Sequence, residues 1–219
     1  MNQSLRIAHA SDLHSNLLVL KGVDVNNIDA WILTGDFFPN LTRGKVETEI
    51  NFQTDWFRKK RETIFRVLGN KPVINVDGNH DFVSLGQLLK EYAYAGEVLQ
   101  INEHEVVEFR GLKFAGHGYI PWIEGEWRGE LRTPEMLKVV NNLFDTHTAD
   151  VLVTHTAPAG ILAGHWGCGA LSNRLFYGDH TFTHHFFGHV HQHTPQTQTE
   201  HGIQFFNSAT GCQLVEIFQ

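Results

Sequence analysis

Residues 72–81 read PVINVDGNHD, and this stretch contains the pattern on which the fold prediction depends. The run PVINV is largely apolar and β-branched, which is typical of a short strand buried in an α/β sheet. Asp77 follows it directly, and then come a glycine and three polar residues: Gly78, Asn79, His80 and Asp81. Open α/β sheets bind ligands outside the carboxyl ends of their strands, so this segment predicts a strand that ends at a binding site.

The same arrangement recurs four more times along the chain. The runs at 5–10, 30–34, 150–154 and 183–187 are short and largely apolar, and polar residues follow each of them. The polar residues of interest after the five predicted strands are Asp12, His14, Asp36, Asn79, His80, His155, His189 and His191. If the five strand ends converge, carboxylate, imidazole and amide groups meet in one place. These groups are ligands for divalent first-row metals, and no thiolate is among them.

Two features of the local spacing favour a shared site. Asp12 and His14 are two residues apart, so an extended backbone would point both side chains to the same side. His189 and His191 have the same spacing, and in an extended backbone they could face one site or two adjacent ones. Glycines stand directly before three of the candidate positions, at Gly35, Gly78 and Gly188. We expect these glycines to let the backbone turn sharply where each strand ends.

Each motif taken alone has a simpler structural explanation. An Asp-x-His pair is more often a turn or a helix cap than a metal site, and a single histidine after a strand is usually a structural residue. The Gly-Asn step of GNHD is by itself only a turn signal. Five strand ends that all carry such residues are hard to produce by chance, so the joint pattern favours a metal site.

The remaining segments predict a single α/β domain over residues 1–219. Apolar residues recur with the helical period over 46–68 and Gly69 provides a stop, which predicts one long amphipathic helix. A second helix is expected at Thr133-Pro134, with Thr133 as its N-cap. Further strands are predicted at 98–101, 105–110, 112–115, 203–208 and 213–218. We find no repeat of fixed period and no linker in the sequence.

Composition limits the possible functions. Hydrophobic residues make up 42% of the 219 residues and charged residues 19%, which is enough apolar material for a sizeable core. The formal charge of −7 argues against a surface for long nucleic acid, although it leaves a small phosphorylated ligand open. No apolar run approaches the roughly 20 residues that span a bilayer, so we expect no membrane association. Only two cysteines, Cys168 and Cys212, and an N-terminus without a secretory pattern predict a cytoplasmic protein.

The five polar blocks resemble one known family. The series SDLH, GD, GNHD, VLVTH and GHVH, in this order over residues 11–191, is similar to the calcineurin-like metallophosphoesterase superfamily. The segments DVLVTHTAPAGIL, GCGAL, HFFGHVH and FFNSA also resemble the small cytosolic phosphodiesterases related to the brain metallophosphoesterase-domain proteins. The protein-phosphatase branch carries Asp-Arg-Gly shortly after its Gly-Asp. Here GDFFPN stands instead, which disfavours a protein phosphatase.

The resemblance implies a fold and a set of metal ligands. The expected fold is a four-layer α-β-β-α sandwich, in which two mixed sheets pack face to face with helices outside. Two divalent ions are implied, with manganese as the first expectation and iron, zinc, nickel or cobalt as alternatives. The matching residues for the first ion are Asp12, His14, Asp36 and His191. Those for the second ion are Asp36, Asn79, His155 and His189, so Asp36 would bridge the two.

The resemblance also implies catalytic roles. Two ions about 3.5–4 Å apart share a hydroxide that attacks phosphorus, and they clamp the phosphoryl oxygens. His80 would protonate the leaving oxygen or steady the phosphate. Asp81 would either orient that imidazole or cap the following helix, and both alternatives are open. His117 and His185 match no ligand: His117 could line the pocket, whereas His185 is better explained as a core residue or a support for a ligand.

The expected activity is hydrolysis of small phosphodiesters, with cyclic nucleotides among the possible substrates. A phosphomonoesterase or a nuclease on the same site is the alternative within the enzymes. A metal-stabilised scaffold without catalysis is the alternative outside them, and it is disfavoured because every ligand position is filled. The expected partner is a small phosphoester, and the oligomeric state stays open.

A count of charges favours a diester over a monoester. Two divalent ions carry four positive charges, and two carboxylates with a shared hydroxide remove three, which leaves about one to match a singly charged diester. A monoester dianion would need further cations, such as an arginine fork. The arginines in candidate loops are Arg43, Arg128 and Arg174, each several residues from a ligand position. The aromatic residues that could stack an ester group are Phe37, Phe38, Tyr119 and Trp122.

Overall fold

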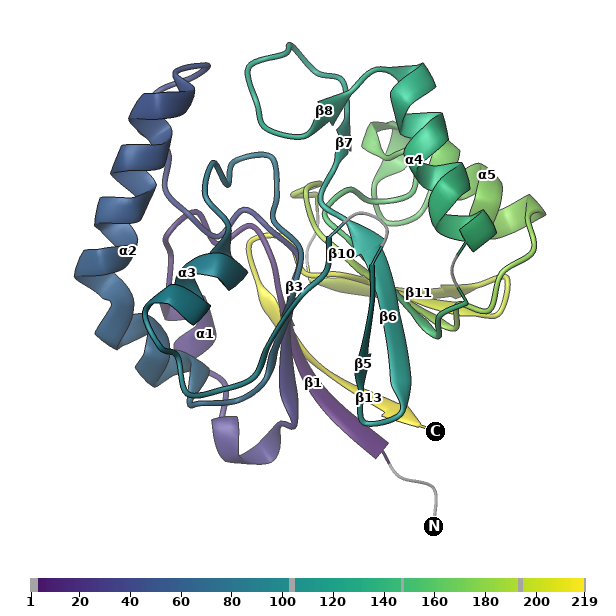
Figure 1. Ribbon diagram of the computed structural model, residues 1–219. Coiled ribbons are helices and arrows are strands. Elements are labelled where there is room, and N and C mark those ends of the chain that lie inside the picture. The colour runs from purple at the N-terminus through teal and green to yellow at the C-terminus, as the bar shows by residue number, and fades with distance from the viewer. Residues whose placement is uncertain (1–3, 103–104, 147, 193–194, 219) are drawn as a thin grey trace.

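Two large mixed sheets form the centre of the protein, and helices cover their outer faces (Figure 1). The computed structural model describes residues 4–102, 105–146, 148–192 and 195–218. The first sheet has the strand order β13-β1-β2-β3-β4. Its strands are β1 (Ser4–Ala10), β2 (Ala30–Leu33), β3 (Val73–Asn75), β4 (Val98–Gln100) and β13 (Cys212–Phe218). Neighbours from β1 to β4 are parallel, and β13 is antiparallel to β1.

The second sheet has the strand order β11-β12-β10-β9-β6-β5. Its strands are β5 (Val106–Phe109), β6 (Leu112–His117), β9 (Val151–Thr154), β10 (His184–Phe187), β11 (Gln196–Glu200) and β12 (Ile203–Asn207). The four inner strands are parallel, and the edge strands β5 and β11 are antiparallel to their neighbours. A small parallel pair, β7 (Ile120–Pro121) and β8 (Glu130–Leu131), lies in the segment that follows β6.

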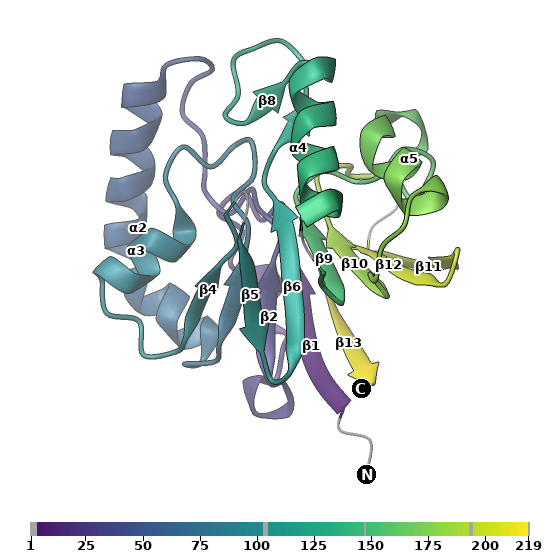
Figure 2. The same ribbon diagram turned by 45° about the vertical axis from the view of Figure 1, so that its right-hand side comes forward.

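Buried apolar residues divide the molecule into layers. Side chains from both sheets, including Ile7, Ile74 and Phe186, form one core cluster between the sheets. A second cluster joins the first sheet to α1 (Leu18–Lys21), α2 (Val46–Leu68) and α3 (Leu85–Glu91). A third cluster joins the second sheet to α4 (Thr133–Thr146) and α5 (Gly169–Tyr177). Figure 2 shows these layers with α2 and α3 on one side and α4 and α5 on the other. The predicted α-β-β-α sandwich is confirmed.

Helix α2 forms over the residues that the sequence predicts. Its buried apolar side chains include Phe57, Ile64 and Leu68, which recur near the helical period. Gly69 ends the helix in a left-handed conformation with φ of 62° and donates its N–H to Phe65 O.

Several short elements lie outside the sequence-based prediction. These are α1, α5, β7, β8 and β11, together with short 3-10 turns at Val25–Asn27 and Gly164–Trp166, whereas α3 is the helix expected after Asp81. Strand β11 reads QTQTE, and an edge strand without apolar residues gives no hydrophobic alternation to detect. Thr133 lies within α4, one residue further into the helix than the predicted N-cap position. Among the described residues, no helix has both the length and the apolar character needed to cross a membrane.

Candidate metal centre

Backbone hydrogen bonds bring the ends of strands from both sheets together. Asp12 N donates to Gly35 O at 2.9 Å, and this bond joins the segments after β1 and β2. Gly188 N donates to His155 O at 3.0 Å, which joins the segments after β9 and β10. The two sheets are linked where the Nδ1 atom of His155 lies 2.7 Å from Thr34 O. The predicted polar residues therefore gather at one edge of the sandwich.

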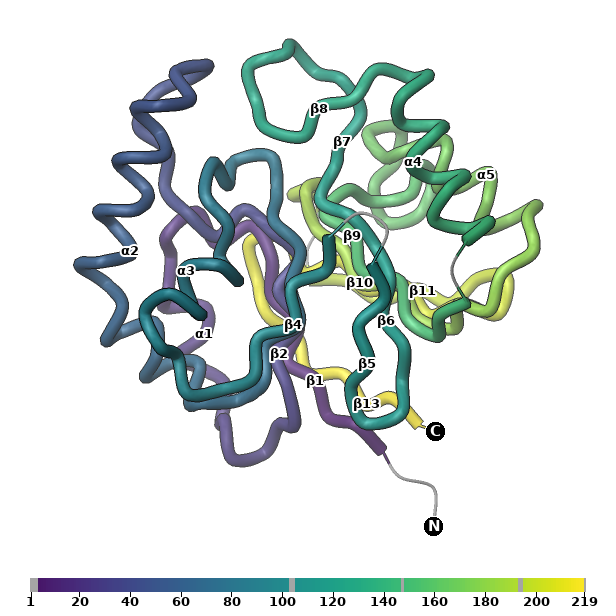
Figure 3. Tube along the Cα trace, in the orientation of Figure 1, coloured from purple at the N-terminus to yellow at the C-terminus, as the bar shows by residue number. Residues whose placement is uncertain are grey.

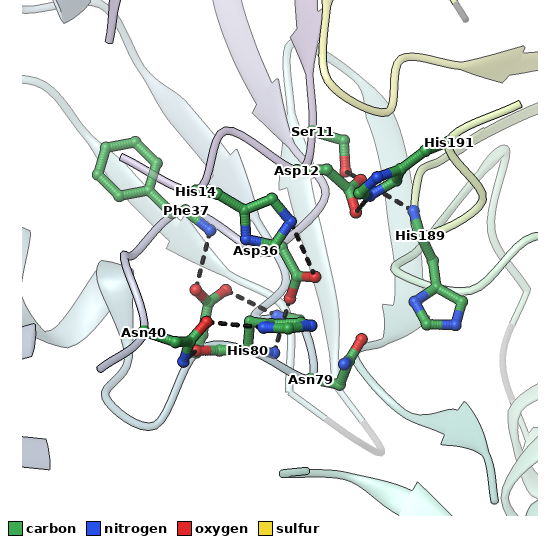
Figure 4. A network of polar contacts seen from close by, with 12 residues as sticks. Ser11, Asp12, His14, Asp36, Phe37, Asn40, Asn79, His80, His189 and His191 are labelled. Carbon is green, nitrogen blue, oxygen red and sulfur yellow. Dashed lines mark hydrogen bonds and ion pairs between the residues drawn. The ribbon is translucent and has the colours of Figure 1, made fainter. Parts of the chain in front are cut away.

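Three overlapping groups of side chains at this edge are close enough to hold metal ions. Within each group, one ligand atom per residue lies within 4.8 Å of the others. The groups are Asp12–His14–His191, His14–Asp36–His80 and Asp36–His155–His189. Figure 4 shows the side chains of these groups other than His155 gathered in one place, with Asn79 beside them. Asp36 belongs to two groups, which is the position that a bridging ligand requires.

Distances within the groups show which atoms face one another. Asp36 Oδ2 lies 3.4 Å from His155 Nε2 and 3.8 Å from His14 Nε2. Asp12 Oδ1 lies 2.9 Å from His191 Nε2. Backbone N–H groups hold the other oxygen of each carboxylate, since Asp36 Oδ1 accepts from His80 N and Asp12 Oδ2 from His189 N, both at 2.8 Å. One oxygen of each carboxylate is thus fixed by the backbone, and the other faces imidazoles.

Several of the gathered residues have an unusual backbone conformation. Asp12, His14, Asp36 and His189 have positive φ angles of 54°, 42°, 54° and 67°. Such angles are uncommon outside glycine, and strain of this kind concentrates at functional sites. The extended backbone that we predicted for the Asp12–His14 and His189–His191 pairs is therefore wrong. Tight turns place these side chains instead.

The glycines before these residues serve two different purposes. Gly35 has φ of 95° and makes the sharp turn that the sequence predicts. Gly78 and Gly188 are needed for space instead, because a Cβ on Gly78 would collide with Oδ1 of Asp36, and one on Gly188 with Oδ2 of Asp12. The backbone passes directly against the two carboxylates, which explains why no larger residue fits there.

The two buried carboxylates remain charged because imidazoles face them. Burial alone raises the pKa of Asp36, but His155, His80 and His14 together outweigh it and hold that pKa below its usual range. Burial alone lowers the pKa of His155, but Asp36 raises it to about 10. The pKa of Asp12 is also lowered, because the hydrogen bond from His191, the charge of His155 and the hydrogen bond from Ser11 together exceed the effect of burial.

These residues fit divalent metal ions. Asp12 is 2% exposed and Asp36 1%, and His155 is buried with them, whereas the other imidazoles of the cluster are half-buried or, at His191, exposed. Oxygen and imidazole donors suit first-row divalent metals. Thr34 O accepts from Nδ1 of His155, which presents Nε2 to Asp36 as a metal-binding histidine usually requires. A proton on His155 and a metal ion would compete for the same carboxylate.

Asp81 has a different role from both predicted alternatives. Its Oδ1 accepts hydrogen bonds from Phe37 N at 2.8 Å and Phe38 N at 3.1 Å, and its Oδ2 accepts from Gly78 N at 2.8 Å. Ser84 supplies the N-cap of α3. Burial, and then the charge of Asp36, raise the pKa of Asp81 to about 7. Asp81 therefore holds the backbone of the segments next to Asp36. The residue that contacts Nδ1 of the His80 ring is Asn40.

His117 and His185 are buried in the core of the second sheet. Their exposed fractions are 1% and 0%, so the suggestion that His117 lines a pocket is wrong. Tyr119 N donates to His117 Nδ1, and His185 Nε2 lies 2.8 Å from Thr154 Oγ1. Burial lowers the pKa of His117 to about 4 and that of His185 well below its ordinary value. Both rings are neutral core residues.

The predicted loop arginines occupy three different environments. Arg174 pairs with Asp145 at 2.6 Å on the outer helices. Arg128 is closer to the site than its sequence position suggests, since its guanidinium donates to Asp81 O at 2.8 Å. Arg43 pairs with Glu124 at 3.1 Å. Figure 3 shows the corresponding loops, one before α2 and one between β7 and β8, at the same end of the molecule.

The aromatic residues at the site are only in part those that we predicted, since Tyr119 lines a cavity beside Gly78, whereas Trp122 lines a different one. Phe37 and Phe38 are 2% and 0% exposed and belong to the core, so they cannot stack a ligand. Trp127 lies against His80 with 4.0 Å between ring centroids, and Trp166 lines a shallow hollow with His189 and His191. Neither tryptophan follows a predicted strand. The strand-end pattern could not find them.

Comparison with known proteins agrees with the geometry. The chain matches the calcineurin-like phosphoesterase family over residues 5–193 and belongs to it. No curated protein gives a significant match. One solved crystal structure shares 16% identity and a TM-score of 0.67, covering 94% of this chain and 90% of its own.

Two further solved structures show the same fold. TT1561 of Thermus thermophilus is 15% identical with a TM-score of 0.60, covering 97% of this chain and 99% of its own. The phosphopantetheinyl hydrolase of Mycobacterium tuberculosis is 15% identical with a TM-score of 0.53, covering 93% and 88%. The family and the three side-chain groups together support a metal-binding hydrolase of phosphoesters.

We expect manganese ions to stabilise the protein against heat. A ligand that binds only the folded state, at a concentration of 100 times its Kd, adds about 2.7 kcal/mol to the free energy of unfolding. The melting temperature should therefore rise with manganese, and a chelator should reverse the rise. Differential scanning fluorimetry with and without manganese measures this. Asp55→Asn, on the exposed outer side of α2, should keep the full shift, whereas Asp36→Asn should lose most of it. Equal shifts in both variants would contradict the proposed site.

Proposed function

We propose that the protein hydrolyses small phosphodiesters with two divalent ions, manganese being our first choice. The observation that carries the proposal is the position of Asp36 in two overlapping groups of imidazoles. In this proposal one ion is held by Asp12, His14, Asp36 and His191. The other is held by Asp36, Asn79, His155 and His189.

The geometry of the apo side chains supports this division. The group Asp12–His14–His191 contains three of the four ligands proposed for the first ion, and Asp36–His155–His189 three of those for the second. Asn79 Oδ1 lies 2.9 Å from His155 Nε2, which places the amide oxygen beside the second group. When bound, the ions would polarise the phosphoryl group and activate water for attack.

His80 is the residue that we propose to transfer the proton to the leaving oxygen. Its backbone N–H binds Asp36 Oδ1 at 2.8 Å, so the ring stands at a fixed distance from the ligand cluster. Nδ1 of the ring lies 2.6 Å from Asn40 Oδ1, which leaves Nε2 for the substrate. Because His80 also forms a group with His14 and Asp36, a role as a metal ligand is the competing assignment.

A cavity beside the site offers room for an organic ester group. It has a volume of about 360 Å³ and is lined by Asp77, Gly78, Gln100, Tyr119 and Arg128, among others. Gly78 directly precedes Asn79, so the cavity adjoins the proposed ligands. A diester with one polar organic group in this cavity would place its phosphorus near the imidazole cluster. We also propose the phosphodiesterase subgroup suggested by the sequence and, because both cysteines are free thiols, a cytoplasmic location.

We expect bis(p-nitrophenyl) phosphate to be hydrolysed with a higher kcat/KM than p-nitrophenyl phosphate at neutral pH with manganese. The nearest arginines already have partners, since Arg43 binds Glu124 and Arg128 binds Asp81 O. A monoester dianion would lack one charged hydrogen bond, which is worth about 1.5–3 kcal/mol, so we expect a preference of roughly tenfold or more.

A higher kcat/KM for p-nitrophenyl phosphate would show that an arginine leaves its partner to bind the dianion. Arg43→Ala and Arg128→Ala would then identify which one, with Arg174→Ala on the outer helices as the control. A panel of phosphoesters with metal analysis of the same samples tests the whole proposal. Bound metal without turnover of any phosphoester would favour a scaffold instead.

A further inference from the structure

Helix α2 buries two polar side chains that its apolar pattern does not explain. Glu49 and Gln53 are one helical turn apart, and both are 0% exposed. Buried polar groups are costly unless they form hydrogen bonds, so their partners indicate what they hold in place. Their partners lie in two loops, one after β2 and one after β3.

Gln53 clamps the loop that contains His80. Its Nε2 donates to His80 O at 2.7 Å and to Pro39 O at 3.2 Å. Its Oε1 accepts from Phe82 N at 2.8 Å and Val83 N at 3.3 Å. One amide therefore holds the carbonyl of His80 and the backbone N–H groups that follow it, and it ties them to Pro39 in the other loop.

Glu49 holds the other loop, which carries Asn40. Its carboxylate accepts hydrogen bonds from Leu41 N at 2.9 Å, from the backbone N–H of Thr42 and from the Thr42 hydroxyl at 3.0 Å. Nδ2 of Asn40 lies a further 3.4 Å from Glu49 Oε2. The loop is thus built around a buried carboxylate on the first turn of α2.

Asn40 connects this network to the ring of His80. Its Nδ2 donates to His80 O at 3.0 Å, which fixes the orientation of the amide. Its Oδ1 must then accept, so the hydrogen lies on Nδ1 of His80, at a separation of 2.6 Å. Trp127 and His14 contact the same ring, with centroids 4.0 Å and 4.8 Å away. The tautomer and the direction of the imidazole are both determined by these neighbours.

We propose that Asn40, Gln53 and Glu49 are positioning residues that hold the Nδ1–H of His80 toward Asn40 and its Nε2 toward the substrate, so that the proton given to the leaving oxygen is the one that Nε2 carries when the ring is doubly protonated. The inference rests on the proposed role of His80 in phosphodiester hydrolysis. It assigns to α2 a part in the active site, although the helix supplies no proposed metal ligand. A purely structural role for the network would predict unfolding or loss of metal on mutation. A positioning role predicts loss of turnover with the metal retained.

The test uses Asn40→Leu, which keeps the size of the side chain and removes both hydrogen bonds to His80. We expect kcat to fall roughly 10–100-fold, the usual effect of losing a supporting hydrogen bond, with KM and metal content unchanged. Asn40→Asp keeps an acceptor for Nδ1 and should recover much of kcat. Asn51→Ala, at an exposed position on the same helix, is the matched control and should behave as wild type.

A spectroscopic measurement tests the tautomer without relying on activity. Zinc-loaded protein with ¹⁵N-labelled histidine gives long-range ¹H–¹⁵N correlations that distinguish Nδ1–H from Nε2–H, and the His80 signal is the one lost in His80→Gln. We expect the Nδ1–H form in wild type and Asn40→Asp, and a mixture in Asn40→Leu. Gln53→Met, which keeps volume but loses all four hydrogen bonds, should broaden or shift the same signal.

Distinct results would overturn the inference. An unchanged tautomer and unchanged kcat in both Asn40→Leu and Gln53→Met would do so, as would a loss of bound zinc equal to that of Asp36→Asn. If Asn40→Leu fails to fold, Gln53→Met and Asn40→Asp still give the spectroscopic answer. If the wild type hydrolyses no phosphoester, the proposed function fails, whereas the tautomer still decides the positioning role.

Discussion

Asp36→Asn is expected to abolish hydrolysis and to lower the metal content at both proposed positions. Asp36 is shared by two ligand groups, and its Oδ2 faces His155 at 3.4 Å and His14 at 3.8 Å. A neutral amide bridges two cations poorly, and bound metals contribute several kcal/mol to such reactions. We therefore expect a loss of roughly a thousandfold or more in kcat.

The measurement combines elemental analysis with kinetics on the same preparation. Asparagine has the shape of aspartate and can still accept the N–H of His80, so the loop after β3 should remain folded. Asp55→Asn, which changes an exposed carboxylate on α2, controls for the loss of one charge. If Asp36→Asn binds two metal ions per chain and keeps its activity, Asp36 is not the bridging ligand.

The sequence could predict the site because its chemistry lies at strand ends. Short apolar runs mark the strands, and the parallel strands of one sheet bring their carboxyl ends to a common edge. What the pattern could not predict is the conformation at those ends. Asp12 and Asp36 have positive φ angles, and the backbone at Gly188 and Gly78 passes directly against their carboxylates; both features depend on segments that are distant in sequence.

The sequence pattern could not identify residues whose side chains hold the backbone of distant segments. Asp81 was placed near His80 because it is next in the chain, yet its carboxylate binds the backbone of Phe37 and Phe38, more than 40 residues away. Gln53 and Glu49 interrupt an amphipathic helix, and a hydrophobic period treats them as surface positions. Only the packed structure shows that they face the loops of the site.

The fold, like the site, could be predicted only where the signal lies in residues that are close together in the sequence. The long helix α2 was predictable because apolar residues recur along it and Gly69 ends it. The division into two sheets was implied by the resemblance alone, since alternation cannot tell which strands pair. Strand β13 follows β12 in sequence but pairs with β1 in the other sheet, and nothing local marks that change.

His80→Ala is expected to lower kcat by roughly 10²–10⁴, the usual size of a general acid–base contribution, while both metals stay bound. The ring contacts Asn40 and Trp127, and the hydrogen bond from the backbone N–H of His80 to Asp36 does not depend on the side chain. The bridge geometry should therefore survive the substitution.

The dependence on the leaving group separates proton transfer from metal binding. An alkoxide must be protonated as it leaves, whereas p-nitrophenolate departs without a proton, so the loss in His80→Ala should be large for an alkyl diester and small for a nitrophenyl diester. Kinetics on both substrates and metal analysis of the same samples measure this, with His201→Ala on an exposed turn as the control. The group His14–Asp36–His80 supplies the rival assignment. If His80→Ala loses metal as fully as His191→Ala, and both substrates slow equally, His80 is a ligand and the proton must come from elsewhere.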